Sequence, residues 1–473
     1  MSDHFLREFG VGDFDVRVTG SALLPSAFAV TDFAAASIAA AGCSTQRLAR
    51  LLGAPGAASI TVDRRLASLW FGFSIVPDGW ALPPTWDDLA GDYETADGWI
   101  KLHTNAARHR AAALSVLGCE ASKSAVSAAV RCWSGAALES AVVDAGGCAG
   151  QLRDAATWMS HPQGAAVAGE PLLAVVPGSV AGSSIGGAAA VSAASSSSSS
   201  WSSQPLRGVR VLDLTRILAG PVATRFLAGL GADVLRIDPV DWDEPSLAPE
   251  VTLGKRCARL DLCTCEGRAR FSELLADADI LIHGYRPSAL DDLGFGAPQR
   301  ALMAPGLVEV TLDAYGWSGP WAGRRGFDSL VQMSSGIAAA GQEMAGAAKP
   351  VSLPVQALDH ATGYLMAAAA IDGWCDRLDA GRGSVTRASL ARTAKVLLDG
   401  PSGSLDAPFA GVTATDLAGV TAADPAAVAD IEHTAWGPAR RVRFPLHIPG
   451  VTFAWPRPAN PFGSEPTPAW LPR

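Results

Sequence analysis

Short apolar runs typical of buried β-strands recur in the second half of the chain. They lie at residues 209–214, 232–237, 279–282 and 307–312. Segments with the spacing of amphipathic helices stand between them, at residues 222–230 and 266–276. Strand, turn, helix and strand within roughly 30 residues form a βαβ unit, whose crossover makes the two strands parallel. The pattern therefore predicts an α/β fold with a Rossmann-like, doubly wound parallel sheet.

The loops that follow these strands are the expected ligand site. An open α/β sheet binds its ligands beyond the carboxyl ends of its strands, which places the site at residues 215–221, 284–287 and 313–316. The segment contains no GxGxxG motif, so the sequence does not favour a nicotinamide dinucleotide.

Residues 182–204 consist almost entirely of serine, glycine and alanine, and they offer no face that could pack. We interpret them as a flexible linker between residues 1–181 and residues 205–395, with residues 396–473 as a closing segment. The alternating run at residues 98–103 predicts a short strand in the first part of the chain. We expect a second, smaller α+β domain there.

Composition restricts the classes of function. The 473 residues carry a formal charge of −9, which does not suit a nucleic-acid partner. The apolar stretches are interrupted by polar residues, and the first residues lack the basic start and apolar run of a secretory signal. The eight cysteines lack the paired spacing of a metal site. We expect a cytoplasmic protein without a metal or a membrane partner.

Two alanine-rich segments look like copies of each other. Residues 28–35 and residues 355–362 each contain an aspartate, Asp32 and Asp359, just before a run of strong helix formers. This is where an N-cap or first-turn residue belongs. From the local sequence alone, both aspartates fit the interpretation of helix caps.

Six motifs, in this order, resemble the family III CoA-transferases of the CaiB/BaiF type. They are residues 206–215, 219–221, 230–237, 254–262, 285–287 and 325–328. In the first half, residues 92–100 resemble the strand that begins the small domain of the family, and residues 161–163 resemble a later element of it. Residues 436–440 and 461–464 resemble the closing segment of the family. Either the halves of the module thus occur in permuted order, or one module of a tandem pair has been trimmed.

The resemblance implies a site and its ligands. The catalytic carboxylate falls on Asp359, with Asp32 as the rival copy. The positions similar to CoA-contacting residues are Ile217, Leu218, Ala219, Leu260, Tyr285, Ala289 and Tyr315. The family uses acyl-CoA and a small carboxylic acid as substrates, needs no permanently bound cofactor, and forms interlaced homodimers. A homodimer is therefore expected.

Several polar contacts of the family are replaced here. Where other members have a basic residue or asparagine near the nucleotide, this chain has Pro239, Gly284, Asp292 and Asp313. Nearby basic side chains could compensate for the lost contacts: Arg216, Lys255, Arg256 and Arg286.

The implied reaction moves CoA between two acids. The aspartate attacks a thioester to give a mixed anhydride, the released thiolate converts the anhydride into an aspartyl-CoA thioester, and an acceptor acid reverses the sequence. Free backbone N–H groups at a helix start can stabilise the oxyanion. Of the histidines, His360 follows Asp359 but points about 100° away on a helix. We expect His103, His109 and His161 to be solvated or packed in the core.

Two other functions stay open. Family members that racemise 2-methylacyl-CoA carry a histidine where Phe327 stands, and phenylalanine cannot exchange a proton, so Phe327 favours transfer over racemisation. A catalytically inactive CoA-binding subunit is also consistent with the permuted halves and the lost polar contacts.

Overall fold

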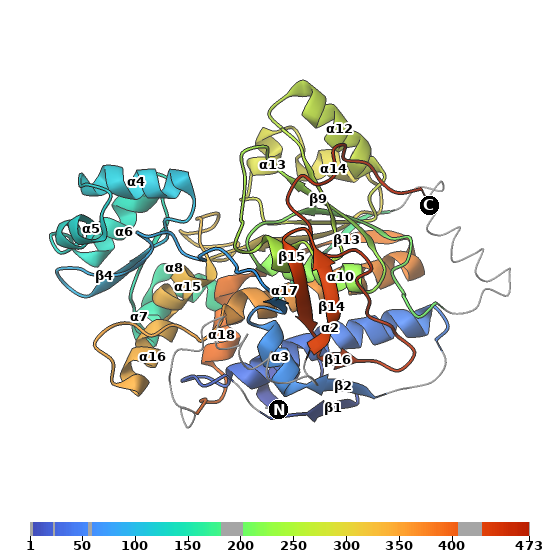
Figure 1. The fold of residues 1–473 in the computed structure, drawn as a ribbon, viewed down its shortest axis with the longest axis horizontal. Helices are drawn as coiled ribbons and strands as arrows, with labels where there is room; N and C mark the ends of the chain where they lie inside the picture. The colour runs from blue at the N-terminus through green and yellow to red at the C-terminus, as the bar shows by residue number, and fades with distance from the viewer. Residues whose placement is uncertain (1–2, 22–23, 55–58, 181–201, 405–427, 473) are drawn as a thin grey trace.

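The computed structural model describes residues 3–21, 24–54, 59–180, 202–404 and 428–472. At its centre lies a seven-stranded sheet with the order β10-β9-β8-β11-β12-β13-β7 (Figure 1). Its strands are β7 (Ala174–Val180), β8 (Arg210–Leu214), β9 (Asp233–Asp238), β10 (Arg256–Arg259), β11 (Ile280–His283), β12 (Val308–Asp313) and β13 (Arg382–Ser389). All neighbours pair in parallel except β7, which runs antiparallel to β13. The predicted α/β class and mostly parallel sheet are confirmed.

The order of the six parallel strands follows the doubly wound pattern. Numbered from β8, it reads 3-2-1-4-5-6 across the sheet. The order in which strands are added to the sheet therefore reverses between β8 and β11, and the loops that leave these two parallel strands diverge. A crevice forms at such a switch point, beyond the carboxyl ends of the strands.

Helices stand between the strands of this sheet in the sequence, and the last of them follows β13. They are α10 (Ala219–Gly229), α11 (Ala248–Val251), α12 (Cys265–Ala276), α13 (Ala289–Asp292), α14 (Ala297–Met303), α15 (Asp328–Ser335), α16 (Ile337–Ala345), α17 (Ala357–Ala380) and α18 (Leu390–Leu398). Almost every residue of α17 is buried, because this helix packs along β12 and β13, α10 and α2 (Val30–Leu51). None of the described helices is both long and apolar enough to span a lipid bilayer.

The two similar segments of the sequence form α2 and α17, and the two helices lie against each other. Each is followed by a strand, β2 (Ile60–Asp63) after α2 and β13 after α17. Strand β2 belongs to a small sheet with β1 (Val16–Thr19) and β16 (Leu446–His447). Helix α2 therefore lacks the large sheet that supports α17.

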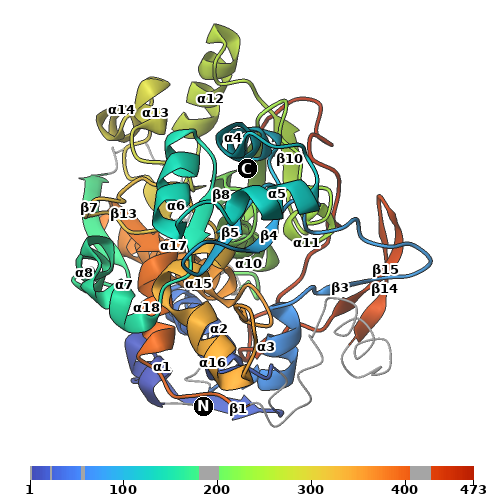
Figure 2. The same ribbon diagram turned by 90° about the vertical axis from the view of Figure 1, so that its left-hand side faces the viewer.

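A smaller α+β lobe has its own core. It comprises β4 (Gly91–Glu94), β5 (Trp99–Leu102), β6 (Ala149–Gln151), α4 (Ala107–Leu117), α5 (Lys123–Val130) and α6 (Gly135–Asp144). Its sheet is antiparallel, and side chains such as Tyr93, Ile100 and Val142 fill a core separate from that of the main sheet. Figure 2 shows its helices in front of the main sheet.

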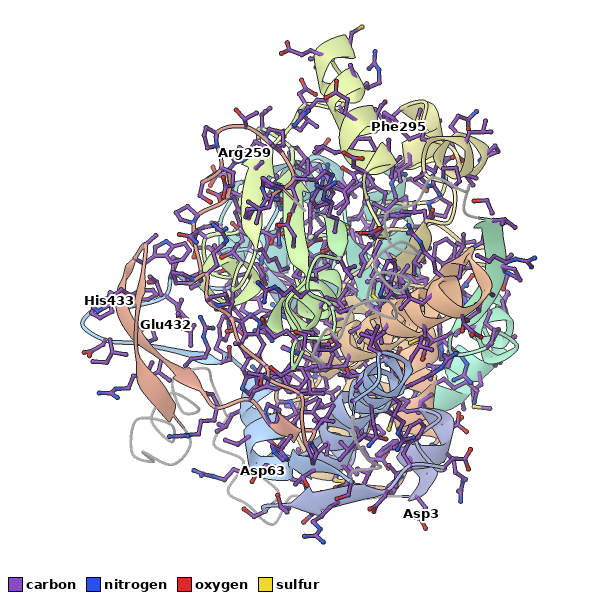
Figure 3. All side chains as sticks on the ribbon, turned by 90° about the vertical axis from the view of Figure 1, so that its right-hand side faces the viewer. Asp3, Asp63, Arg259, Phe295, Glu432 and His433 are labelled. Atoms are coloured by element: carbon purple, nitrogen blue, oxygen red, sulfur yellow. The ribbon has the colours of Figure 1, made fainter. Side chains whose placement is uncertain are left out.

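The remaining elements connect these parts. They are α1 (Asp3–Glu8), α3 (Arg64–Trp70), β3 (Ile75–Pro77), α7 (Ala155–Ser160), α8 (Pro162–Ala168), β14 (Val428–Thr434) and β15 (Gly437–Val442). Strands β14, β15 and β3 form a further sheet, and Figure 3 shows its residues Glu432 and His433 at the margin of the molecule.

The predicted linker falls mostly on residues 181–201, which lie outside the described residues. Strand β7 precedes this segment in the sequence, yet it forms the edge of the main sheet. The division into residues 1–181 and 205–395 thus stays a description of the sequence.

Candidate active site

A cavity of about 330 Å³ opens at the switch point of the main sheet. The loops after β8 and β11 contribute Thr215 and Tyr285 to its wall, and the last residue of β12 contributes Asp313. Asp359 at the start of α17 also lines the cavity. Helix α4 of the small lobe adds Arg108 and His109. The expectation that ligand-binding residues follow the strands therefore agrees with the cavity, but the contribution of the small lobe was not predicted.

The loop from β8 to α10 carries an unusual backbone conformation. Ile217 has a φ of 63°, in the left-handed region that a β-branched residue rarely adopts. Its N–H donates a hydrogen bond of 2.8 Å to Glu244 Oε1, and Trp242 Nε1 donates to the same oxygen at 2.7 Å. Such conformations persist only where the surrounding structure holds them, and they concentrate at functional sites.

A buried ion pair stabilises the loop from β8 to α10. Lys255 Nζ lies 3.0 Å from Asp213 Oδ2, and neither side chain is exposed. The other oxygen of Asp213 accepts hydrogen bonds from the Thr215 N–H (2.9 Å) and hydroxyl (2.5 Å), while Thr224 donates to Oδ2. Burial lowers the pKa of Lys255 to about 8, although Asp213 opposes this shift. Lys255 therefore stabilises the loop from β8 to α10 and does not line the cavity.

Asp359 sits in the first turn of α17 and is only 5% exposed. The backbone N–H of Ala219, the first residue of α10, donates a hydrogen bond to its carboxylate. The close contact between the two helices depends on Gly363, one turn further along α17. A Cβ at Gly363 would lie 2.4 Å from the carbonyl oxygen of Ala219. The glycine therefore allows the carboxylate to reach the positive end of α10.

A second buried carboxylate stands beside the first. Asp328 Oδ2 accepts a hydrogen bond of 2.9 Å from the backbone N–H of Asp359, and Gln332 donates to Asp328 Oδ1. Burial is the main reason why the pKa of Asp359 is raised well above its usual range, and the charge of Asp328 adds to this effect. Burial likewise raises the pKa of Asp328 to about 6. Either carboxyl group is thus harder to ionise than an exposed one.

The residues predicted to contact CoA fall into two groups. Ile217, Ala219, Tyr285 and Ala289 line the cavity together with Asp359. The others lie behind the cavity wall. Leu218 is buried, and Tyr315 is buried with its hydroxyl 3.1 Å from Ser334 Oγ. Leu260 packs into the apolar cluster between the sheet and α12.

The basic residues named in the sequence analysis also fall into two groups, those that line the cavity and those outside it. Arg216 and Arg286 line the cavity, whereas Arg256 pairs with Asp233 at 2.9 Å outside it. Of the replaced polar positions, Gly284 and Asp313 line the cavity. Burial raises the pKa of Asp313 to about 7, although its Oδ1 accepts hydrogen bonds from two backbone N–H groups.

The histidines near the cavity are buried. His103 stacks on Phe327 with ring centroids 3.8 Å apart, and burial lowers its pKa to about 3. Burial, with help from Arg108 and Arg325, lowers the pKa of His109 to about 4. His360 stacks on Phe71 at 5.0 Å, away from the residues that line the cavity.

The rival aspartate, Asp32, has a different environment. Its carboxylate forms a salt bridge with Arg64, and it does not line the cavity. The sheet beside α2 is the small one of β1, β2 and β16, and not the large parallel sheet whose loops surround Asp359. The structure therefore places one of the two copies at a candidate site.

Comparisons with known proteins point to one family. Residues 206–405 match the model of CoA-transferase family III. The chain is similar to the acetyl-coenzyme A transferase nodX of Hypoxylon pulicicidum, with 32% identity over 38% of this chain and 31% of that protein. It is also similar to the succinyl-CoA:glutarate CoA-transferase of Mus musculus, with 32% identity over 38% of this chain and 44% of that protein.

Among solved structures, a CAIB/BAIF family protein from Brucella suis matches with a TM-score of 0.37 and 24% identity, over 42% of this chain and 60% of that one. The chain spans less than half the length of the two curated relatives named above.

Proposed function

We propose that the protein transfers coenzyme A from an acyl-CoA thioester to a carboxylic acid, with Asp359 as the nucleophile, because residues 206–405 match the model of CoA-transferase family III. The observation that carries the proposal is the position of Asp359. Its carboxylate lies on the wall of a cavity at the switch point, in contact with the N-terminus of α10. A thioester bound in the cavity would meet this carboxylate.

The proposed reaction proceeds through two covalent forms of Asp359. The carboxylate attacks the thioester carbon, the C–S bond breaks, and CoA leaves as a thiolate while an acyl-aspartyl anhydride remains. The thiolate then attacks the aspartyl carbonyl and releases the acyl group as a carboxylate. An acceptor carboxylate attacks the aspartyl-CoA thioester and the same steps run backwards, so no oxidant, metal or net proton is consumed.

The N-terminus of α10 suits the charges that develop in these steps. The first N–H groups of a helix have no intrahelical acceptor, and the helix end carries partial positive charge. Ala219 already donates to Asp359, and Gly220, the next residue, also lines the cavity. These N–H groups stabilise the ionised nucleophile and an oxyanion formed beside it.

Proton exchange at the α-carbon of an acyl-CoA is less well supported. It requires an acid–base group on each face of that carbon. Phe327 lines the cavity but cannot carry a proton, and His109, which also lines it, has a pKa of about 4. His109 Nε2 already accepts a hydrogen bond of 3.3 Å from Arg108 Nε. Transfer of coenzyme A, by contrast, needs no acid–base side chain at the α-carbon, and Asp359 is the only side chain that must react.

The proposal is tested by trapping the covalent forms. The purified chain is incubated with a panel of acyl-CoA thioesters, quenched with hydroxylamine or borohydride, and digested for peptide mass spectrometry. We expect modification of Asp359, none of Asp32, and no modification in Asp359→Asn. A protein that binds CoA but is never modified would be a non-catalytic CoA-binding subunit. Sedimentation of the same sample tests the expected homodimer.

A further inference from the structure

Glu244 binds two of the residues that line the cavity. Its Oε1 accepts hydrogen bonds from the Ile217 N–H, at 2.8 Å, and from Trp242 Nε1, at 2.7 Å. Ile217 belongs to the loop from β8 to α10, Trp242 belongs to the segment between β9 and α11, and both line the cavity. One carboxylate thus connects two separate parts of the cavity wall.

The charge of Glu244 is only partly compensated. Its side chain is buried, and burial raises the pKa of its carboxyl group, although Arg236 opposes this shift. Arg236 Nη2 lies 3.5 Å from Glu244 Oε2, but the same guanidinium already donates two hydrogen bonds of 2.9 Å to Asp238. Oε2 has no hydrogen-bond partner among the described residues. Because a loosely paired buried charge costs stability, stability alone does not account for a carboxylate at this position.

The backbone that Glu244 holds is strained. Ile217 has a φ of 63°, which a β-branched residue keeps only where its surroundings impose it. Two residues further along the chain, the N–H of Ala219 donates a hydrogen bond to Asp359. A change of φ at Ile217 would therefore displace the backbone donor that contacts the proposed nucleophile.

Trp242 connects the same carboxylate to the small lobe. The centre of its indole ring lies 5.1 Å from the guanidinium carbon of Arg216 and 5.8 Å from that of Arg108, which belongs to α4. Both distances are within the range of cation–π contacts. The indole has a single hydrogen-bond donor, and Glu244 accepts from it. Glu244 therefore also fixes the ring that contacts arginines of both lobes.

We propose that Glu244 is a positioning residue for the transfer reaction, because it holds Ile217 and Trp242 in place and thereby keeps the N–H of Ala219 against Asp359. This inference rests on the proposed function and deepens it. Glu244 does not itself line the cavity, so it acts through the two residues that it binds. Preorganised backbone donors of this kind need no rearrangement when charge develops during the reaction.

Substitutions of Glu244 in the full chain test the proposal. Glu244→Met removes both acceptor oxygens and keeps the volume, while Arg236 keeps Asp238 as its partner, so we expect the variant to fold. The measured quantity is the rate at which an acyl-CoA thioester modifies Asp359 in a single turnover. Glu244→Met should lower this rate about 100-fold, the effect of a displacement of about 1 Å. Glu244→Gln, whose amide oxygen can accept both hydrogen bonds, should stay within about threefold of the unmodified protein.

Ile217→Gly separates positioning from stabilisation in a double-mutant cycle. Glycine adopts a positive φ without strain, so the loop no longer needs Glu244 to hold its backbone. The loss of rate caused by Glu244→Met should therefore shrink to about tenfold or less when Ile217→Gly is also present. Hydrogen exchange gives a measurement that does not depend on activity. The amide hydrogens of residues 215–221 should exchange at least about tenfold faster in Glu244→Met than in the unmodified protein.

Glu432→Met is the matched control. Its carboxylate pairs with Arg441 at 2.6 Å, and Arg441 keeps a second partner, Glu250, at 3.4 Å. Neither Glu432 nor Arg441 lines the cavity, and Figure 3 shows Glu432 at the margin of the molecule. The rate of modification should stay within about twofold in this variant.

Three results would overturn the proposal. Equal losses with and without Ile217→Gly would show that Glu244 does not act through this backbone. A Glu244→Met variant that unfolds at lower urea concentration but modifies Asp359 at the normal rate would make Glu244 a stabilising residue only. A large loss of rate in Glu244→Gln would contradict the mechanism even if Glu244→Met failed to fold, since the amide keeps the acceptor oxygen.

The two proposals fail separately. Faster exchange at residues 215–221 in Glu244→Met, with no adduct on Asp359 in any variant, would remove the transfer activity and leave Glu244 as the residue that holds the loop. An adduct on Asp359 that forms at the same rate with and without the Glu244 carboxylate would remove only the positioning role.

Discussion

The backbone N–H of Asp359 donates a 2.9 Å hydrogen bond to the carboxylate of Asp328, so two buried acidic residues meet at the start of α17. Asp328 thereby caps a helix whose own N-cap residue, Gln356, forms no side-chain cap. The same contact places one negative charge beside the proposed nucleophile. Asp328 is thus a positioning residue that also opposes ionisation of Asp359.

Replacing Asp359 by asparagine should abolish transfer and stabilise the fold. The substitution removes the attacking oxygen, so we expect kcat to fall by at least about 10³-fold. It also removes a carboxyl group that must ionise in a buried site beside Asp328, so the melting temperature at pH 8 should rise. Calorimetry and a transfer assay on the same sample check both effects. A destabilised Asp359→Asn would contradict the description of Asp359 as a buried acid whose ionisation is opposed by burial and by Asp328.

The pH dependence of stability follows from the same pair. Both carboxyl groups have raised pKa values in the folded protein, so between pH 4 and those values the folded state binds more protons than the unfolded state. This pair therefore lowers the free energy of unfolding as the pH rises through this window, whereas His103 and His109, whose pKa values are lowered, contribute with the opposite sign. Urea unfolding from pH 5 to pH 8 measures it. The decline should be smaller in Asp359→Asn than in the unmodified protein, and an equal decline would contradict the assignment.

Asp328→Asn should move the pH profile of the reaction. The amide oxygen can still accept the hydrogen bond from Asp359, but the negative charge is gone, so the pKa of Asp359 should fall. Since only the ionised carboxylate attacks, the acidic limb of the kcat/KM profile should shift to lower pH. A lower plateau with an unshifted limb would indicate that Asp328 only supports the helix.

The sequence predicted the strands and loops that support this site better than it predicted the residues that line the cavity. Apolar runs identified β8, β9, β11 and β12 of the main sheet, because these strands are buried on both faces, whereas β7, β10 and β13 were not predicted. The loops after β8 and β11 could be located for the same reason. The family resemblance then placed Asp359, which a local pattern alone would describe as a helix cap.

The missed residues come from distant parts of the chain. Arg108 and His109 lie on an ordinary amphipathic helix, and nothing near them in the sequence indicates that α4 faces the sheet. Lys255 was considered as a basic residue for the ligand, but it is buried in an ion pair with Asp213. Which residues line the cavity and which are buried behind it depends on how distant elements of the chain pack together. The periodicity of the sequence does not contain this information.

Gly363 should tolerate no side chain. Because a Cβ there would lie 2.4 Å from the Ala219 carbonyl, Gly363→Ala must push α17 away from α10. Overpacking of this kind costs about 1–3 kcal/mol, and a displacement of Asp359 by about 1 Å could reduce kcat about 100-fold. Gly12→Ala is the control, because no atom lies within 4 Å of its added Cβ. A Gly363→Ala variant with normal kcat would show that the helix contact does not position the nucleophile.

Lys255→Met should be the most destabilising of these substitutions. It would leave Asp213 charged and buried beneath the loop that carries Ile217, with only hydroxyl and backbone donors around it. Removing one partner of a buried ion pair typically costs about 3–5 kcal/mol. The exposed pair Arg131–Glu94 provides the contrast, since its removal should change stability by less than about 1 kcal/mol. Urea unfolding of Lys255→Met and Arg131→Met measures both. If the two losses were equal, the Asp213–Lys255 pair would not be what holds the β8–α10 loop in its strained conformation.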